Sequence, residues 1–159
     1  MVFRGVEVDF WWSSVPDEVC FPYPPGVKFM AKKGQKGMDL ALTCARAAAE
    51  IQAEEIRIWD LRGLSSLTDF MVVCSASSMP HLRAILRDVR GHVEEWTGEK
   101  PANAEGRVDT RWVVLDYIDV MVHVMHEELR EYYGLEPLWG DAVEVALPEE
   151  NHEAATNNR

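Results

Sequence analysis

The chain has 159 residues, of which 47% are hydrophobic and 27% are charged, and its formal net charge at pH 7 is −11. This length and apolar content support a domain with a real core and exclude a disordered protein. No apolar run approaches the roughly 20 residues of a membrane span. The excess of acidic residues argues against a protein that binds nucleic acid through its phosphates. Three cysteines without a CxxC pair argue against a disulfide framework or a zinc site and indicate a reduced, cytoplasmic chain.

The first 37 residues differ in composition from the rest. They contain two adjacent tryptophans and four of the eight prolines, without sustained periodicity. Their acidic residues match neither a secretory signal nor an organellar transit peptide. We therefore expect residues 1–37 to be an extension outside the core, with Met30 as a candidate for the true start. One domain over 38–146 and a loose polar tail over 147–159 are expected to follow.

Hydrophobic periodicity predicts the first half of the fold. A helix is expected over 39–52, with the aspartate at its first position as N-cap. Strands are expected over 56–61 and 69–76, and the second is so uniformly apolar that both of its faces should be covered. A core-facing helix should begin after Ser77 and Ser78, which both offer an N-cap, and end at Gly98.

The second half contains a predicted hairpin. Residues 99–110 lack periodicity and are expected to form a loop. Two strands rich in β-branched residues, over 112–117 and 119–125, are separated too briefly for anything but a hairpin. A helix should follow over 126–133. The resulting order α-β-β-α-β-β-α predicts an α/β fold with a mixed sheet of about four to five strands.

Two carboxylates, Asp116 and Asp119, lie at the predicted hairpin tip, and His123 follows on the next strand. Paired carboxylates beside a histidine can hold a metal or act as acid and base, but aspartates in turns also bond nearby backbone amides. His123 lies in an apolar run, where histidine is more often structural, and its spacing from His126 is no zinc signature. We expect no metal and no cofactor.

A second polar cluster, GLSSLTDF over 63–70, leads into a strand through Asp69. A glycine–serine turn before an acidic strand is similar to the entrance of a nucleotidyltransferase active site. That chemistry needs two carboxylates on alternate strand positions to bridge two metal ions, and Met71 stands at the second position. A phosphoryl-transfer enzyme would have to combine Asp69 with Asp116 or Asp119. The absent partner favours a protein without catalysis, in which these residues order the loop.

Large aromatic side chains and mixed charge follow one another from the last predicted helix onward. This composition is typical of a docking surface, where Tyr, Trp and Arg dominate the binding energy, and an acidic surface suits a basic partner. Alternatively, the aromatic residues seal the core while the glutamates face water. The cluster comprises Glu127, Glu128, Arg130, Glu131, Tyr132, Tyr133, Leu135, Glu136, Leu138 and Trp139.

Four ordered motifs, S-S-x-T-D, W-x-x-x-D, V-x-V-H and Y-x-L-E-x-L-W, occur in the runs SSLTDFMVVCSASS and RWVVLDYIDVMVHVMHEELREYYGLEPLWGDA. With them the chain resembles the ribosomal silencing factor (Iojap) family over residues 41–142. The resemblance implies a nucleotidyltransferase-like fold without the carboxylate pair. It implies binding to the large ribosomal subunit through ribosomal protein fourteen, which blocks joining with the small subunit and represses translation under nutrient limitation. Family members have also been found as dimers.

The resemblance assigns Ser66, Thr68 and Asp69 to the first motif and Trp112 to the second. It implies a ribosome-facing surface on the hairpin and the final helix. One departure lies at the hairpin tip, where the family usually has glycine and this chain has Ile118. Isoleucine is strained at positive φ, so we expect a different turn there and a displaced acidic neighbour. The expected partner-binding residues are Asp116, Asp119, His123, Glu127, Arg130, Tyr133, Leu135, Glu136, Leu138 and Trp139.

Overall fold

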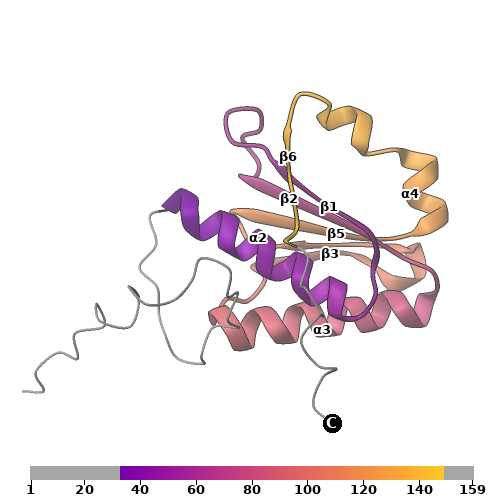
Figure 1. Cartoon of the computed structure of the whole chain (residues 1–159). Helices are drawn as coiled ribbons and strands as arrows, with labels where there is room; N and C mark the ends of the chain where they lie inside the picture. Colours follow the sequence, from indigo (N-terminus) through magenta and orange to yellow (C-terminus); the bar gives the residue numbers. More distant parts are fainter. Residues whose placement is uncertain (1–32, 149–159) are drawn as a thin grey trace, which may run out of the picture.

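The structure, a computed structural model, describes residues 33–148. These residues form three helices and a six-stranded mixed sheet in the order α-β-β-α-β-β-β-α-β (Figure 1). The predicted extension, apart from residues 33–37, and the predicted tail, apart from residues 147 and 148, lie outside the described residues. The elements are α2 (Lys33–Glu50), β1 (Glu54–Asp60), β2 (Phe70–Ala76), α3 (Met79–Thr97), β3 (Asn103–Arg107), the 3-10 helix η1 (Val108–Thr110), β4 (Trp112–Asp116), β5 (Val120–His126), α4 (Glu127–Tyr133), the 3-10 helix η2 (Glu136–Trp139) and β6 (Val143–Val145).

The sheet has the strand order β3-β4-β5-β2-β1-β6. Its central pair, β2 and β5, is parallel, and all the other neighbouring pairs are antiparallel. Each of the seven residues of β2 is buried, which confirms that this strand is covered on both faces. The mixed sheet and the β4–β5 hairpin were both predicted, whereas the strand count of four to five was too low.

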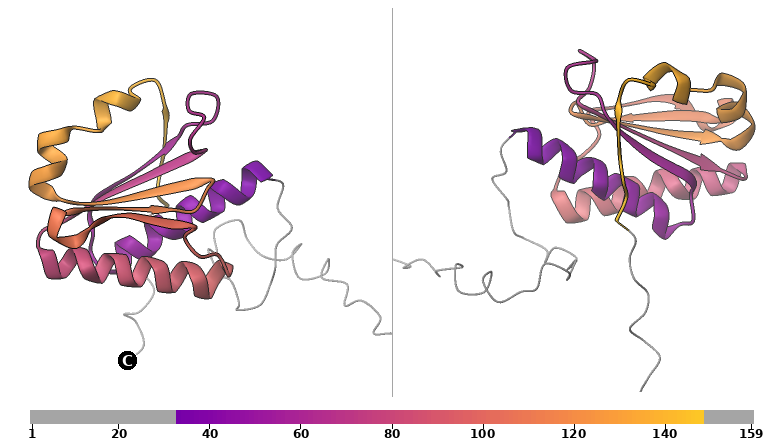
Figure 2. Two further views of the ribbon diagram at one scale, coloured as in Figure 1. Left: turned by 180° about the vertical axis from the view of Figure 1, so that it is seen from behind. Right: turned by 45° about the horizontal axis from the view of Figure 1, so that its top comes forward.

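The sheet separates two cores of unequal size. Helices α2 and α3 cover one face, and α4 with the segment after it lies over part of the other (Figure 2). The larger core contains Leu82, Ile85 and Val89 of α3 packed against the sheet. The smaller core is centred on Trp59, Met71 and Met125, which belong to the face of the sheet that α4 covers, here called the α4 face. The second core is what positions α4 and η2.

Helix α3 begins and ends where the sequence predicts. The Ser78 side chain accepts a hydrogen bond from the backbone N–H of His81 at 3.3 Å, and Pro80 lies in the first turn. Gly98 ends the helix with φ +72° and donates its N–H to the Glu94 carbonyl. The long hydrophobic stripe of α3 is therefore fixed against the sheet by local signals at both ends.

The first helix begins earlier than predicted, so Asp39 is not its N-cap. Asp39 lies within α2, where its carbonyl accepts a hydrogen bond from Thr43 Oγ1 at 2.7 Å and burial raises the pKa of its carboxyl group. The helix reaches Lys33 through Gly37, and a Cβ atom at Gly37 would lie 3.0 Å from the Phe70 ring. Gly37 therefore permits close packing of α2 on β2.

Two strands were missed at the edges of the sheet. Residues 103–107 were expected in a loop but form β3, whose five residues are all exposed and pair with β4. Gly106 has φ +85° there, and a Cβ atom would lie 2.3 Å from the Trp112 carbonyl oxygen. Strand β6 has only three residues and pairs with β1. The exposed strand β3, with the sequence NAEGR, carries no apolar alternation, and the three residues VEV of β6 are too few for alternation to identify a strand.

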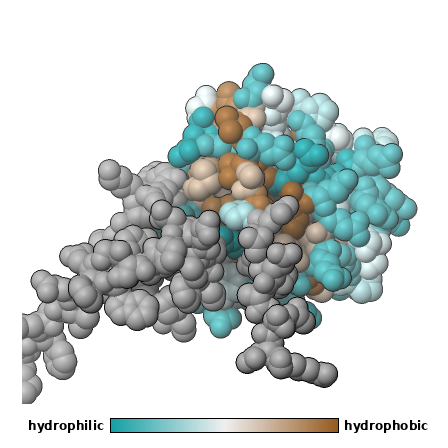
Figure 3. Space-filling view, viewed as in Figure 1, coloured by the Kyte–Doolittle hydropathy of each residue, from teal (hydrophilic) through white to brown (hydrophobic). Residues whose placement is uncertain are grey.

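Figure 3 shows the face with α2 and β6 as largely hydrophilic, with a hydrophobic strip through its middle. Among the described residues, no helix has the combination of length and apolarity that a membrane crossing requires.

Candidate functional site

The tip of the β4–β5 hairpin is a tight turn around Ile118. Asp119 donates its backbone N–H to the Tyr117 carbonyl at 2.9 Å, the spacing of a γ-turn, and Ile118 has φ +74°. Asp116 Oδ1 accepts the backbone N–H of Ile118 at 2.7 Å. Isoleucine thus adopts the positive φ that we expected it to avoid, because the hydrogen bonds of the hairpin impose this conformation.

The two acidic residues of the tip have structural roles. Asp116 stabilises the turn through the hydrogen bond just described. The Asp119 carbonyl accepts the backbone N–H groups of Asp69 and Phe70 at 3.1 and 3.0 Å, which fixes the hairpin to the start of β2. In the described part of the chain, no group of three or more His, Cys, Asp or Glu side chains is placed to hold a metal ion.

The first motif orders the β1–β2 loop. Thr68 is buried and donates its hydroxyl to the Phe70 carbonyl at 3.0 Å. Ser65 Oγ accepts the backbone N–H of Leu67 at 3.1 Å, while Ser66 is exposed. The loop also exposes two large apolar side chains, Leu64 (53%) and Leu67 (80%), which the sequence analysis did not single out. Two leucines within an otherwise polar loop were the sequence signal that could have identified these exposed apolar side chains.

His123 is the buried member of an aromatic cluster on the α4 face, in which Trp112 is half-buried and Tyr133 is exposed. It is 8% exposed, and its Nδ1 accepts a hydrogen bond from Trp112 Nε1 at 3.3 Å. The Trp112 ring also contacts Tyr133, with 5.3 Å between ring centroids. Burial lowers the pKa of His123 to about 4, so the ring is neutral at pH 7. His123 thus supports the surface from beneath and does not present a charge to a partner.

Arg130 is the centre of a buried polar network, although the sequence placed it on the ribosome-facing surface. It is 3% exposed. Its Nη1 donates to the Glu55 carbonyl and to Ser75 Oγ, at 2.5 and 3.0 Å, and its Nε donates to Glu136 Oε1 at 2.8 Å. These four residues, here called the Arg130 network, join α4 to β1, β2 and η2. The guanidinium is used internally, so Arg130 positions the surface rather than forming it.

The partners of Arg130 show how the network is built. Glu55 has φ +48° at a register shift in β1, and this irregularity turns its carbonyl toward the arginine. Partial burial opposes ionisation of Glu136, but the hydrogen bond and the charge of Arg130 outweigh it, so the pKa of Glu136 is lowered. Glu136 is therefore ionised at neutral pH and holds η2 against α4.

The exposed side chains of α4 and η2 are mostly acidic or aromatic. Tyr132 is 81% exposed and its ring meets Tyr133 edge to face at 5.1 Å between centroids. Arg111, which sequence reasoning missed, pairs with Glu128 at 2.6 Å. We call this the α4 surface, and it consists of Glu127, Glu128, Glu131, Tyr132, Tyr133 and Leu138.

The remaining predicted docking residues lie elsewhere. Leu135 and Trp139 are half-buried and pack on the smaller core, so for them the core-sealing alternative describes the structure. The hairpin tip and α4 lie at opposite ends of β5, a separation of about 20 Å for seven extended residues. The structure thus divides the predicted partner-binding residues between two sites, with His123 buried between them.

An exposed aromatic and acidic surface of this kind is typical of proteins that act by docking on a partner. The family model "Ribosomal silencing factor during starvation" matches residues 35–159. The chain therefore belongs to the ribosomal silencing factor family, whose members are ribosome-binding regulators and not enzymes.

Relatives and solved structures agree with this membership. The chain is 39% identical over 98 residues to ribosomal silencing factor RsfS of Bacillus subtilis, covering 62% of this chain and 82% of that protein. It is 32% identical over 128 residues to the chloroplastic protein Iojap of Zea mays, covering 79% of this chain and 54% of that protein. A crystal structure from Chromobacterium violaceum matches with a TM-score of 0.60 and 30% identity, covering 79% of this chain and 98% of that one. A crystal structure from Bacillus halodurans matches with a TM-score of 0.58 and 33% identity, covering 71% and 99%.

Proposed function

We propose that this chain binds the large ribosomal subunit by docking its α4 surface on ribosomal protein fourteen. The observation that carries the proposal is the exposure of large apolar side chains, Tyr132 at 81% and Leu138 at 70%, among three glutamates. Exposed aromatic groups of this kind supply binding energy when they are desolvated, and the glutamates favour a basic partner. Family membership supports the same partner.

The mechanism is steric. A folded domain bound where the small subunit must land prevents the two subunits from joining, so translation is repressed when nutrients are scarce. This action needs no bond making or breaking, which agrees with the turn-stabilising role of the Asp116 carboxylate. The proposal places the chain in the cytoplasm and gives it a nucleotidyltransferase-like fold without the enzyme's carboxylate pair. It leaves the hairpin tip for a second copy in a homodimer.

Sucrose-gradient fractionation tests the proposal directly. Purified chain should comigrate with isolated large subunits, and adding it before small subunits should reduce the peak of joined ribosomes. A chain that stays in the top fractions, or that comigrates without hindering subunit joining, contradicts the proposal.

The double variant Tyr132→Ala/Leu138→Ala should bind large subunits at least about 30-fold more weakly, since truncating two hot-spot side chains costs about 2 kcal/mol or more. Its thermal midpoint should stay close to that of the wild type, because both side chains are exposed. The matched control is Leu64→Ala/Leu67→Ala, which removes two exposed apolar side chains from the β1–β2 loop. Equal losses in the two double variants would contradict docking through the α4 surface.

A further inference from the structure

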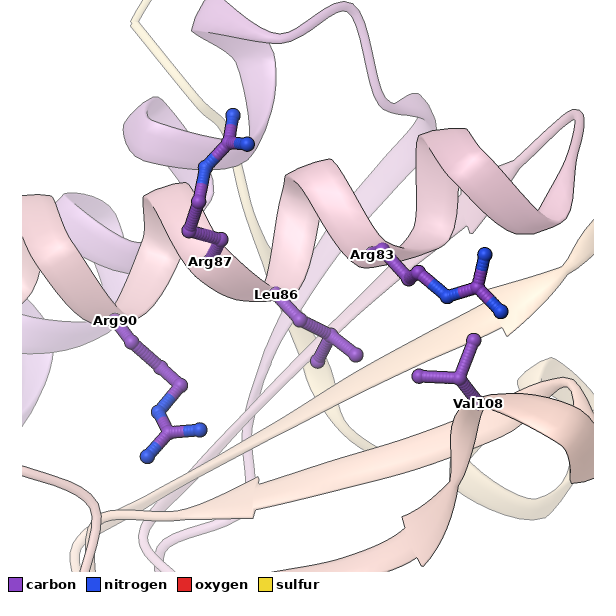
Figure 4. A pocket seen from close by; sticks show the side chains of 5 residues that line it. All are labelled: Arg83, Leu86, Arg87, Arg90 and Val108. Atoms are coloured by element: carbon purple, nitrogen blue, oxygen red, sulfur yellow. The ribbon is translucent and has the colours of Figure 1, made fainter.

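A basic patch lies on the outer side of α3, on a chain whose net charge is −11. Arg83, Arg87 and Arg90 are exposed and line a shallow hollow of about 440 Å³ together with Leu86 and Val108 (Figure 4). Arg83 and Arg90 extend on the two sides of Leu86, toward the same side of the helix as Val108. We call these five residues the α3 arginine groove.

Two of the three guanidinium groups are not neutralised within the described part of the chain. Arg87 pairs with its neighbour Asp88 at 2.6 Å. No carboxylate among the described residues lies within ion-pair distance of Arg83 or Arg90. By contrast, the other exposed arginines between residues 33 and 148 each contact a carboxylate; they are Arg57, Arg62, Arg107 and Arg111. On an otherwise acidic surface, two unpaired arginines on one helix face mark an anion-binding surface.

The lining of the groove indicates the class of anion. Guanidinium groups bind phosphates through paired N–H donors, and Arg83 and Arg90 are separated by seven residues, or about 10 Å along the helix. The floor between them is aliphatic, so the groove has no aromatic side chain on which a base could stack. This combination suits contact with a sugar–phosphate backbone without reading its sequence.

We propose that the α3 arginine groove contacts phosphates of ribosomal RNA while the α4 surface is docked. The inference rests on the proposed function, because the negative charge of a ribosomal subunit is carried by RNA phosphates. Helix α3 lies on the opposite face of the sheet from α4 (Figure 2), so this contact is separate from the α4 surface. An acidic protein segment is the competing occupant, and the second experiment below distinguishes it.

The first test is the salt dependence of binding to purified large subunits. The double variant Arg83→Gln/Arg90→Gln should weaken binding and reduce the slope of log Kd against log salt by about 2, or about 1 for each phosphate that is no longer neutralised. The matched control Lys36→Gln/Lys100→Gln removes two exposed positive charges that are already paired with Glu99 and Glu94. It should keep the wild-type slope.

If the two double variants behave alike while the wild type still binds, the α3 arginine groove makes no phosphate contact and the inference is overturned. If the wild type itself does not comigrate with large subunits, the proposed function fails instead. The two failures are therefore distinguishable in one experiment.

The second test identifies the occupant by cleavage from a tethered probe. Gly91 is exposed on α3, and a Cβ atom there would have no neighbour within 4 Å, so Gly91→Cys in a Cys20→Ser background can carry an iron–EDTA group. Cys44 and Cys74 are buried and should not react. Hydroxyl radicals should cut ribosomal RNA near α3 in the bound complex. A bound complex without RNA cleavage, or with cuts only in a ribosomal protein, would overturn the inference.

Discussion

Ile118 occupies a backbone conformation that glycine adopts without strain. Its φ of +74° crowds the β-branched side chain against the backbone, and 69% of the residue is exposed, so little packing compensates. The strain persists because Asp116, Tyr117 and Asp119 fix the turn on both sides by hydrogen bonds.

Ile118→Gly should therefore raise the free energy of unfolding by about 1 kcal/mol. The substitution relieves the φ strain, and the greater conformational entropy of glycine in the unfolded chain offsets part of that gain. Urea denaturation followed by tryptophan fluorescence measures the change. Ile118→Ala is the control: it removes the same exposed side chain but keeps a Cβ atom, so it should gain much less. Equal effects of the two substitutions would show that φ is not the cause.

The buried His123 makes stability depend on pH. Its pKa is about 4 in the folded chain, against an ordinary 6.5 in the unfolded chain, so the unfolded state binds the proton first as the pH falls. The free energy of unfolding should therefore decrease from pH 6.5 to pH 4, by up to about 3 kcal/mol from this group.

His123→Asn keeps an acceptor for Trp112 Nε1 and removes the titration. Urea unfolding of both proteins at pH 7, 6, 5 and 4.5 measures the difference. The free energy of unfolding of the variant, minus that of the wild type, should increase steadily as the pH falls. If this difference does not change with pH, His123 is not the group that makes stability depend on pH.

At the scale of elements, the Arg130 network holds α4 and η2 in place. Arg130→Met should lower the free energy of unfolding by about 2–3 kcal/mol, because it leaves the Glu55 carbonyl and Ser75 hydroxyl without their buried donor. Hydrogen exchange should accelerate over residues 127–139 more than in α3. Binding to large subunits should weaken although Arg130 itself is buried.

Arg111→Met is the matched control for this variant. Arg111 and Glu128 are both exposed, so their ion pair should contribute less than about 1 kcal/mol. If Arg111→Met lowered the free energy of unfolding as much as Arg130→Met, burial would not explain the contribution of Arg130 to stability.

The elements with strong local signals were predictable. Ser78, Pro80 and Gly98 fix α3 through capping, and the brief break between two β-branched runs fixes the hairpin. Strands β3 and β6 were not predictable, because their pairing depends on β4 and β1 and their exposed residues need no apolar pattern. A strand at a sheet edge is defined by its neighbour more than by its own composition.

The candidate site was predictable in composition but not in orientation. Aromatic residues beside acidic ones after residue 126 indicated a docking surface, and Tyr132 and Leu138 are indeed exposed. Nothing local distinguishes Arg130 from an exposed arginine. Its burial follows from a carbonyl supplied 75 residues away by Glu55, a contact that only the folded sheet creates.

At the scale of the whole molecule, the net charge of −11 opposes compaction, and in the proposed function it assists docking on a basic partner. Salt screens both effects. Raising NaCl from 20 to 300 mM should therefore raise the thermal midpoint by about 2–5 °C, consistent with about 1 kcal/mol of relieved repulsion. Over the same range, affinity for large subunits should fall. Differential scanning calorimetry and gradient binding measure the two trends, and parallel changes would contradict this account.

The Arg130 network also imposes an order on synthesis. Its members come from positions 55, 75, 130 and 136, so the guanidinium gains its last partner only after the ribosome has translated Glu136. A half-made chain therefore has no organised α4 surface. The chain therefore cannot present its α4 surface while the ribosome that makes it is still translating the residues before Glu136.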